Sequence, residues 1–232
     1  MTVDGSSTPS HRRRVVLACR CLKPELEALG AAARTTTIVY LAQSLHRTPE
    51  RMTAVIQEAI DRVPHDVDDV ALGYGLCSNG IVGLRAPSQG LFIPRTHDCV
   101  ALLLGSREAY AQSFRERPGS YYLTPGWLLH KRDPLGMLET DYIPRVGQDD
   151  AEWALREELK NYTHVVYIRT RADHDPRLRA RARQNADFLG KRFEQADGAS
   201  HYLHRLLHGP YESPDFLRVE AGQTVTQQPF FD

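Results

Sequence analysis

The chain has 232 residues, in which 29 Lys and Arg residues balance 29 Asp and Glu residues. Because the formal net charge is zero, no whole-molecule field recruits nucleic acid or an anionic membrane. Hydrophobic residues make up 41% and charged residues 25%, a globular composition that excludes a disordered chain. The longest apolar run, residues 100–104, is far shorter than the ~20 residues that span a bilayer. Since residues 1–10 also lack the apolar core of a signal peptide, we expect a cytoplasmic protein with no membrane or nucleic-acid partner.

The opening residues differ in composition from the rest. Residues 1–13 are polar and rich in Gly, Ser, Pro and Arg, and we expect a disordered tail there. Residues 14–232 are predicted to form a single α/β domain. A division into two lobes, 14–147 and 148–232, is the alternative.

The first half of the chain alternates short apolar segments with longer amphipathic ones. Pro24 is expected at the start of a first helix, and Thr48 to cap a second in which Pro49 is the first residue. From residue 52 to residue 63, apolar side chains recur at helical spacing, and Asp98 is expected to cap a helix that begins near Cys99. The four predicted strands are residues 15–19, 36–41, 67–74 and 91–94.

The second half repeats this rhythm. Residues 121–129 are expected to form a hairpin or an ordered loop, after which Asp149 or Asp150 caps a helix. Later strands are predicted at residues 164–168, 191–195 and 216–219, with helices at 176–189 and 200–207. Parallel strands need such helical crossovers, so the sequence predicts an α/β fold with a mainly parallel, Rossmann-like sheet.

The four cysteines are too few for a disulfide framework in a long cytoplasmic chain. All four, and two histidines, follow predicted strand ends: Cys19, Cys21, His46, Cys77, His97 and Cys99. Because the carboxyl ends of parallel strands lie on one edge of a sheet, we expect these side chains to converge. Cys21 ranks below the other thiols. Separately, an extended backbone over Cys19-Arg20-Cys21 is interpreted as pointing its two thiols to opposite sides. Plain burial of each cysteine as a small hydrophobe is the alternative.

Thiolate and imidazole ligands suit zinc, with iron as the alternative. The predicted metal ligands are Cys19, Cys77 and Cys99 with His46 or His97 as the imidazole. His97 and Asp98 are the nearest acid–base candidates and Tyr74 is a candidate donor, although Asp98 also suits a helix cap. In a metal-free alternative, Cys99 is a nucleophile beside His97 at a helix N-terminus.

Other motifs are weaker. Residues 73–80 are rich in small residues but match neither a dinucleotide fingerprint nor a phosphate loop, so no nucleotide cofactor is expected. Arginines between 169 and 183 are read as a solvated helix face. Tyr121, Tyr122 and Trp127 either line the mouth of the site or pack in the core.

The chain resembles the uncharacterised domain-of-unknown-function family 1638 of bacteria and methanogenic archaea. The resemblance lies in Leu17-Ala18-Cys19, Leu45-His46, Gly73-Tyr74-Gly75-Leu76-Cys77, Ile93-Pro94-Arg95-Thr96-His97-Asp98-Cys99, Leu104-Gly105-Ser106, Pro118-Gly119-Ser120-Tyr121-Tyr122-Leu123-Thr124, Asn161-Tyr162-Thr163 and Asp215-Phe216-Leu217-Arg218-Val219. Cys21 is not part of this pattern, and Glu220-Ala221-Gly222 replaces a more apolar turn. The resemblance implies an association with corrinoid-dependent methyltransferase systems, and hence a corrinoid methyltransferase component as a partner.

We therefore expect a metal-dependent enzyme that acts on a small polar molecule by hydrolysis or methyl-group transfer. The alternatives are a non-catalytic metal-binding accessory protein of a methyltransferase system and a cysteine-nucleophile enzyme.

Overall fold

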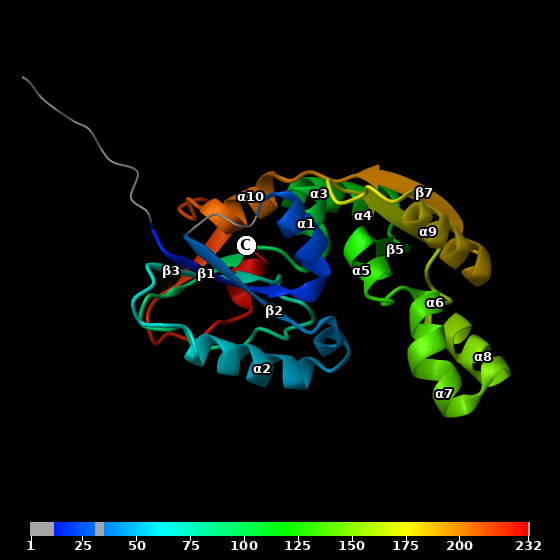
Figure 1. Ribbon diagram of the computed structural model, residues 1–232, viewed down its shortest axis with the longest axis horizontal. Coiled ribbons are helices and arrows are strands. Elements are labelled where there is room, and N and C mark those ends of the chain that lie inside the picture. Colours follow the sequence, from blue (N-terminus) through cyan, green and yellow to red (C-terminus); the bar gives the residue numbers. More distant parts are fainter. Residues whose placement is uncertain (1–11, 31–34, 232) are drawn as a thin grey trace, which may run out of the picture.

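Two β-sheets with helices around them make up the described part of the chain, residues 12–30 and 35–231 of a computed structural model (Figure 1). The first sheet has the strand order β2-β1-β3-β4-β8 and the second the order β5-β6-β7. The strands are β1 Arg14–Cys19, β2 Thr36–Leu41, β3 Asp69–Gly73, β4 Leu91–Pro94, β5 Ser120–Leu123, β6 His164–Arg169, β7 Arg192–Asp197 and β8 Phe216–Val219. All pairings are parallel except that of β4 with β8. The predicted α/β class with mainly parallel sheets is confirmed. Residues 1–11 of the predicted tail lie outside the described residues.

Helices connect most of these strands. They are α1 Lys23–Ala28, α2 Pro49–Asp61, α3 Cys99–Leu104, α4 Arg107–Glu116, α5 Pro125–Leu129, α6 Pro134–Met137, α7 Ile143–Val146, α8 Gln148–Glu158, α9 Pro176–Leu189 and α10 His201–His208. Among the described residues, no helix is long and apolar enough to cross a membrane.

The first sheet carries the edge where the predicted ligands lie. Its central strands β1 and β3 are buried on both faces, which explains their continuous apolar sequences. The strand order changes direction between β1 and β3, since β1 continues to β2 on one side and β3 to β4 on the other. In open α/β sheets, ligands bind at the carboxyl ends of the strands beside such a switch point. Cys19 is the last residue of β1, so the topology places the first predicted thiol there.

Strand β6 of the second sheet contributes side chains to two hydrophobic cores, one of which also contains the first sheet. Along β6, Val165 and Tyr167 belong to a core formed with α8 and α9, whereas Val166 and Ile168 face the larger core that contains the first sheet. This alternation follows the two-residue period of a strand. We call the first sheet with α1, α2, α3 and α10 the first lobe, and the second sheet with α5 to α9 the second lobe. In Figure 1 the first lobe lies at the left, with α2 below its sheet, and the second at the right.

The lobes do not follow the predicted boundary at residue 147. Strand β5, before that residue, pairs with β6 in the second sheet, and β8, near the end of the chain, pairs with β4 in the first. The chain therefore passes from the first lobe to the second and back.

Several local expectations differ from the structure. Residues 121–129 form the end of β5 and then α5, not a hairpin. The Thr48 side chain makes no capping hydrogen bond to α2, although Pro49 does begin that helix. Helix α8 begins after Gly147, so Asp149 and Asp150 lie in its first turn, where acidic side chains favour the helix dipole.

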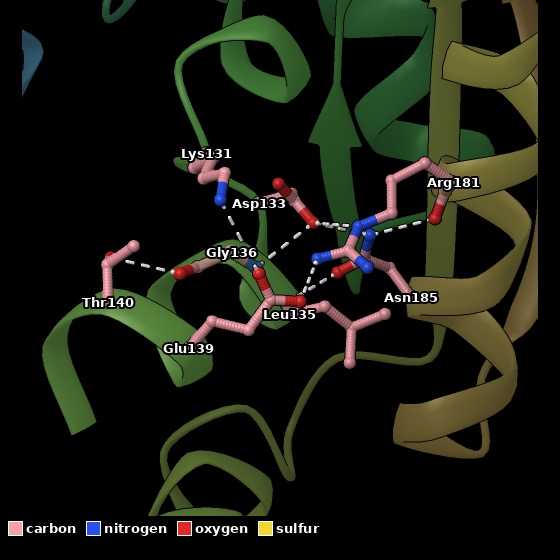
Figure 2. Close-up of polar contacts among 8 residues, drawn as sticks. All are labelled: Lys131, Asp133, Leu135, Gly136, Glu139, Thr140, Arg181 and Asn185. Carbon is pink, nitrogen blue, oxygen red and sulfur yellow. Dashed lines mark hydrogen bonds and ion pairs between the residues drawn. The ribbon is translucent and has the colours of Figure 1, made fainter. Parts of the chain in front are cut away.

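A buried network of hydrogen bonds joins α6 to α9 in the second lobe (Figure 2). The Oδ2 atom of Asp133 accepts hydrogen bonds from the Gly136 backbone N–H at 3.2 Å, Arg181 Nε at 3.1 Å and Asn185 Nδ2 at 2.8 Å. Asn185 Oδ1 accepts in turn from the Leu135 N–H at 2.8 Å, and Arg181 also binds Glu139. Asp133 and Asn185 are both buried, and their polar groups are paired as burial requires.

Candidate thiol and imidazole site

The four cysteines are buried and unbridged, and they lie near the carboxyl edge of the first sheet. Cys19 ends β1, and residues 20–22 form a tight 3-10 turn. The prediction that Cys21 points away from Cys19 is wrong, because residues two apart in an extended strand share a face, and the backbone after Cys19 is not extended. The tight turn brings Cys21 back, and its thiol hydrogen-bonds to the Cys19 sulfur.

A close approach of two loops positions Cys77 and Cys99. The Leu76 N–H donates to the Thr96 carbonyl and the Cys77 N–H donates to the His97 carbonyl, both at 2.8 Å. Only glycine fits at position 75, because a Cβ there would lie 2.7 Å from the Thr96 carbonyl oxygen. Gly75 thus allows the loop after β3 to lie against the loop after β4.

The loop after β3 contains an unusual backbone conformation. Cys77, Ser78 and Asn79 have φ values of 48°, 56° and 66°, all in the left-handed region. Each non-glycine residue in this region costs roughly 1 kcal/mol or more, and such strain collects at functional sites. Three consecutive residues of this kind indicate that the loop tolerates backbone strain in order to place its side chains.

The thiols and one imidazole form a row of contacts, which we call the thiol row. His46 Nε2 lies 3.4 Å from Cys19 Sγ, Cys19 contacts Cys21, and Cys21 Sγ lies 3.9 Å from Cys99 Sγ. His46, not His97, is therefore the imidazole at the thiols. Cys77 interacts electrostatically with Cys99 and Cys19, but no hydrogen bond joins it to another thiol within the described part of the chain.

Cys19 is the thiol of the row that ionises most readily. The hydrogen bond from Cys21 lowers the pKa of the Cys19 thiol to about 5, helped by His46 and opposed by burial. The same hydrogen bond, with that to Cys99 and with burial, raises the pKa of Cys21. Burial raises the pKa of Cys77. The hydrogen bond from Cys21 favours the Cys99 thiolate, but burial and the charges of Cys19 and Asp98 outweigh it, so the pKa of Cys99 is raised.

The spacing of the row can be compared with a metal site. Bond lengths of about 2.3 Å to sulfur and 2.0 Å to nitrogen give tetrahedral edges of roughly 3.8 Å between two sulfurs and 3.5 Å between sulfur and nitrogen. The observed 3.9 Å and 3.4 Å are close to these edges. Across residues 12–30 and 35–231, however, no group of three or more His, Cys, Asp or Glu side chains is already arranged around one point to hold a metal ion. Two neighbouring pairs of donors, His46 with Cys19 and Cys21 with Cys99, therefore have separations that suit a shared metal.

A cavity of about 780 Å³ lies beside the thiol row, between the lobes. His46, Cys77 and Cys99 line it from the first lobe, whereas Cys19 and Cys21 lie outside its lining. The opposite wall is aromatic and includes Tyr121, Tyr122, Trp127 and Tyr162. For Tyr121, Tyr122 and Trp127, the sequence left open whether they line the site or pack in the core, and all three line the cavity. The volume suits a small molecule.

Asp98 and His97, two of the three candidate acid–base residues, both line the cavity. Asp98 caps α3 by accepting from the Val100 N–H at 2.8 Å, as the sequence predicts, and it also accepts from the Tyr110 hydroxyl at 2.9 Å. His97 lines the cavity, and its ring lies 5.2 Å from the Phe231 ring.

Tyr74 is the third candidate. It is fully buried, its hydroxyl has no hydrogen-bond partner among the described residues, and it interacts electrostatically with all four cysteines. Burial and the thiol charges raise its pKa. A buried hydroxyl without a partner is costly, and the charges of all four thiols act on this one.

The comparisons with known proteins identify a family. The sequence profile of the family described as "Protein of unknown function (DUF1638)" matches residues 40–207, well over half of the chain. The chain belongs to this family. The matched segment contains His46, Cys77 and Cys99, whereas Cys19 and Cys21 precede it. No curated protein and no solved structure matches the chain.

Sequence reasoning missed two features of the site. The role of Cys21 depends on the 3-10 turn after β1, and the tight sequence Cys19-Arg20-Cys21 before Pro24 was its only signal. The contribution of Tyr162 to the cavity depends on the pairing of β5 with β6, which no local pattern indicates.

Proposed function

We propose that the protein is a metal-dependent enzyme, with zinc as the metal and iron as the alternative, that acts on a small polar molecule in the cavity between the lobes. The observation that carries this proposal is the thiol row at the switch point of the first sheet. Its four donors, His46, Cys19, Cys21 and Cys99, include three soft thiols in successive contact. Thiol and imidazole ligands select zinc or iron over magnesium or calcium.

The distribution of charge favours a metal over a metal-free thiol. Cys19, the thiol that ionises most readily, is fully buried, whereas Cys77 and Cys99 line the cavity but have raised pKa values. A nucleophile must be both ionised and accessible, and here these properties belong to different residues. A metal ion would favour the thiolate form of all its ligands.

The surrounding side chains have distinct proposed roles. A metal in this row would supply either an activated water, with its pKa lowered toward ~7, or an activated substrate thiol or amine. Tyr74 would offer its unpartnered hydroxyl as a hydrogen-bond donor at the thiol row, and His97 would exchange protons with substrate in the cavity. Hydrolysis and methyl-group transfer both suit this arrangement, and the resemblance described above links the second to a corrinoid methyltransferase partner.

The cysteine-nucleophile enzyme is the second candidate, because the Cys19 pKa of about 5 makes it a thiolate at neutral pH. Cobalt(II) substitution with removal of metal by a chelator separates the candidates. An open coordination position and an activity lost on chelation support the metalloenzyme. Metal saturated by four protein donors supports an accessory metal-binding protein, and full activity without metal supports the nucleophile.

The direct test is elemental analysis of protein purified without a histidine tag. We expect about one zinc or iron per chain, released at acid pH because thiolates and imidazoles must lose protons to bind. Cys21→Ser and Cys99→Ser should each lose most of the metal. Cys77→Ser is the matched control, because Cys77 is equally buried but outside the row, and it should retain more metal. Wild-type protein that neither carries nor takes up zinc or iron would overturn the proposal.

A further inference from the structure

A second cavity, of about 370 Å³, lies at the carboxyl ends of β6 and β7 in the second sheet. Its lining includes Thr170 and Arg171 after β6, Ser200 and His201 after β7, and Glu25 from α1. None of its lining residues belongs to the cavity beside the thiol row. It occupies the edge of its own parallel sheet where α/β proteins bind ligands, and it is therefore a separate candidate site.

Glu25 supplies an unused buried oxygen to this cavity. Its relative exposure is 2%. One carboxyl oxygen, Oε1, accepts from the Thr170 hydroxyl at 3.3 Å, and the backbone N–H groups of Glu25 itself and of Gly126 also favour the charged carboxylate. The other oxygen, Oε2, is buried and has no partner at hydrogen-bond distance among the described residues. Buried polar atoms are almost always paired. An unpaired carboxyl oxygen at a cavity wall therefore points to a ligand that carries a cationic donor.

The other wall of the cavity favours negative charge. Helix α10 begins after Ser200, whose side chain makes no capping hydrogen bond, so the Ser200 hydroxyl does not accept from the first N–H groups of the helix. Free N–H groups and the helix dipole favour an anion at such a position. Arg171, which follows Thr170 in the chain, adds a guanidinium to the lining of the cavity.

The wall at α10 is also firmly packed. The Ala199 N–H donates to the Leu103 carbonyl at 3.1 Å and the Gly198 N–H to the Arg169 carbonyl at 2.8 Å. A Cβ at Gly105 would lie 2.5 Å from Ala199 Cβ and 2.8 Å from His201 Cε1. The start of α10 is thus held against the end of α3, and its N–H groups have a fixed position.

We propose that this second cavity binds a small zwitterion, with its ammonium group at Glu25 and its carboxylate at the start of α10. The lining offers the Glu25 carboxyl group, N–H donors at the start of α10 and the Arg171 guanidinium, so each end of an amino-acid-sized ligand has a partner of opposite charge. The apolar side chains of Leu29, Leu103 and Leu203 also line the cavity. The site does not depend on the metal or on the thiols.

Calorimetry with ω-amino acids of increasing length tests this site. Glycine, β-alanine, 4-aminobutyrate and 5-aminovalerate serve as probes of the distance between the two walls, on the full chain as purified. We expect one length to bind best. N-Acetylation of that probe, which removes the ammonium charge, and conversion of its carboxylate to an amide should each weaken binding about tenfold or more, because contacts with charged groups contribute at that scale.

Glu25→Gln keeps the shape of the side chain and removes its charge, and it should weaken binding of the best probe to a similar extent. The matched control is Glu27→Gln on the same helix, since Glu27 is exposed and pairs with Lys23; it should bind as wild type does. The N-acetyl and amide probes test the site without any variant, so a folding defect in Glu25→Gln does not obscure the result. Absence of binding by all four probes at millimolar concentrations, or equal binding by their N-acetyl forms, would overturn the proposal. Metal content should be unchanged by Glu25→Gln, which separates this test from that of the thiol row.

Discussion

Two buried polar regions of this protein differ in how well their groups are paired. In the second lobe, the Asp133 carboxylate receives three hydrogen bonds and joins α6 to α9 (Figure 2). In the first lobe, the Tyr74 hydroxyl beside the thiol row has no partner among the described residues, and the loop that carries Cys77 is in a left-handed conformation.

This difference indicates that the buried polar groups around Asp133 have a structural role and that those beside the thiol row have a functional one. A satisfied network fixes the packing of helices and leaves nothing for a ligand to contact. Unpartnered groups and backbone strain lower stability, and they persist where a ligand or a reaction needs them. Substitutions in the two regions should therefore have different effects on stability and on metal binding.

The largest effect is expected from Gly126→Ala, at the contact between α5 and the thiol row. A Cβ there would lie 1.8 Å from the Cys21 carbonyl oxygen, so the main chain must move. We expect a loss of about 3 kcal/mol or more in the free energy of unfolding, together with loss of bound metal. Gly190→Ala is the control, because its surroundings are open and only its φ of 65° opposes a side chain. Urea denaturation and elemental analysis measure both outcomes, and retention of full metal content by Gly126→Ala would contradict the proposed role of Cys21.

Asp133→Ala should lower the free energy of unfolding by about 2 to 3 kcal/mol, because it removes the acceptor of one N–H of the buried Asn185 amide, of Arg181 Nε and of the Gly136 N–H. Its metal content per folded chain should equal that of wild type. Asp187→Ala on the exposed side of α9 should change the free energy by less than about 0.5 kcal/mol. A loss of metal in folded Asp133→Ala would remove the distinction between the two regions.

Glu25 provides an intermediate case, because it is as buried as Asp133 but incompletely paired. Burial raises its folded-state pKa to about 7 from an ordinary value of 4.5. The native state therefore holds this proton more tightly than the unfolded chain, and the resulting stability is present below the unfolded pKa and lost as the pH rises through 7. Relative to Glu25→Gln, wild type should lose about 2 kcal/mol of stability from about pH 5 to about pH 8. Urea denaturation at a series of pH values measures this, and parallel pH profiles for the two proteins would show that Glu25 is not perturbed.

The smallest effect is expected from His46→Gln in metal-free protein. His46 favours the Cys19 thiolate, so its removal should raise the Cys19 pKa above about 5 while changing the free energy of unfolding by less than about 1 kcal/mol. The ultraviolet absorbance of the thiolate reports the titration, with Cys19→Ser as the blank. His97→Gln should leave the titration unchanged, since the His97 ring contacts Phe231. If His97→Gln shifts the Cys19 pKa as much as His46→Gln does, the assignment of His46 as the imidazole beside the thiols is wrong.

The sequence by itself determined the fold class and most of its elements. The continuous apolar segments at β1 and β3 and the apolar stripe of α2 are local patterns, and local patterns identify strands and helices. The position of each thiol after a strand then indicated a common edge, since every parallel strand ends on the same side of its sheet. The cap at Asp98 also followed from local chemistry alone, because a cap acts within one turn.

Only the tertiary structure decided which of these groups meet. Cys21 joins the thiol row because a 3-10 turn reverses the chain after β1, and Gly126 of the second lobe packs against that turn. The choice of His46 over His97, the return of β8 to the first sheet and the orphan oxygen of Glu25 depend on contacts between residues far apart in the chain. Such contacts are set by how the elements pack, and packing leaves no periodic signal in the sequence.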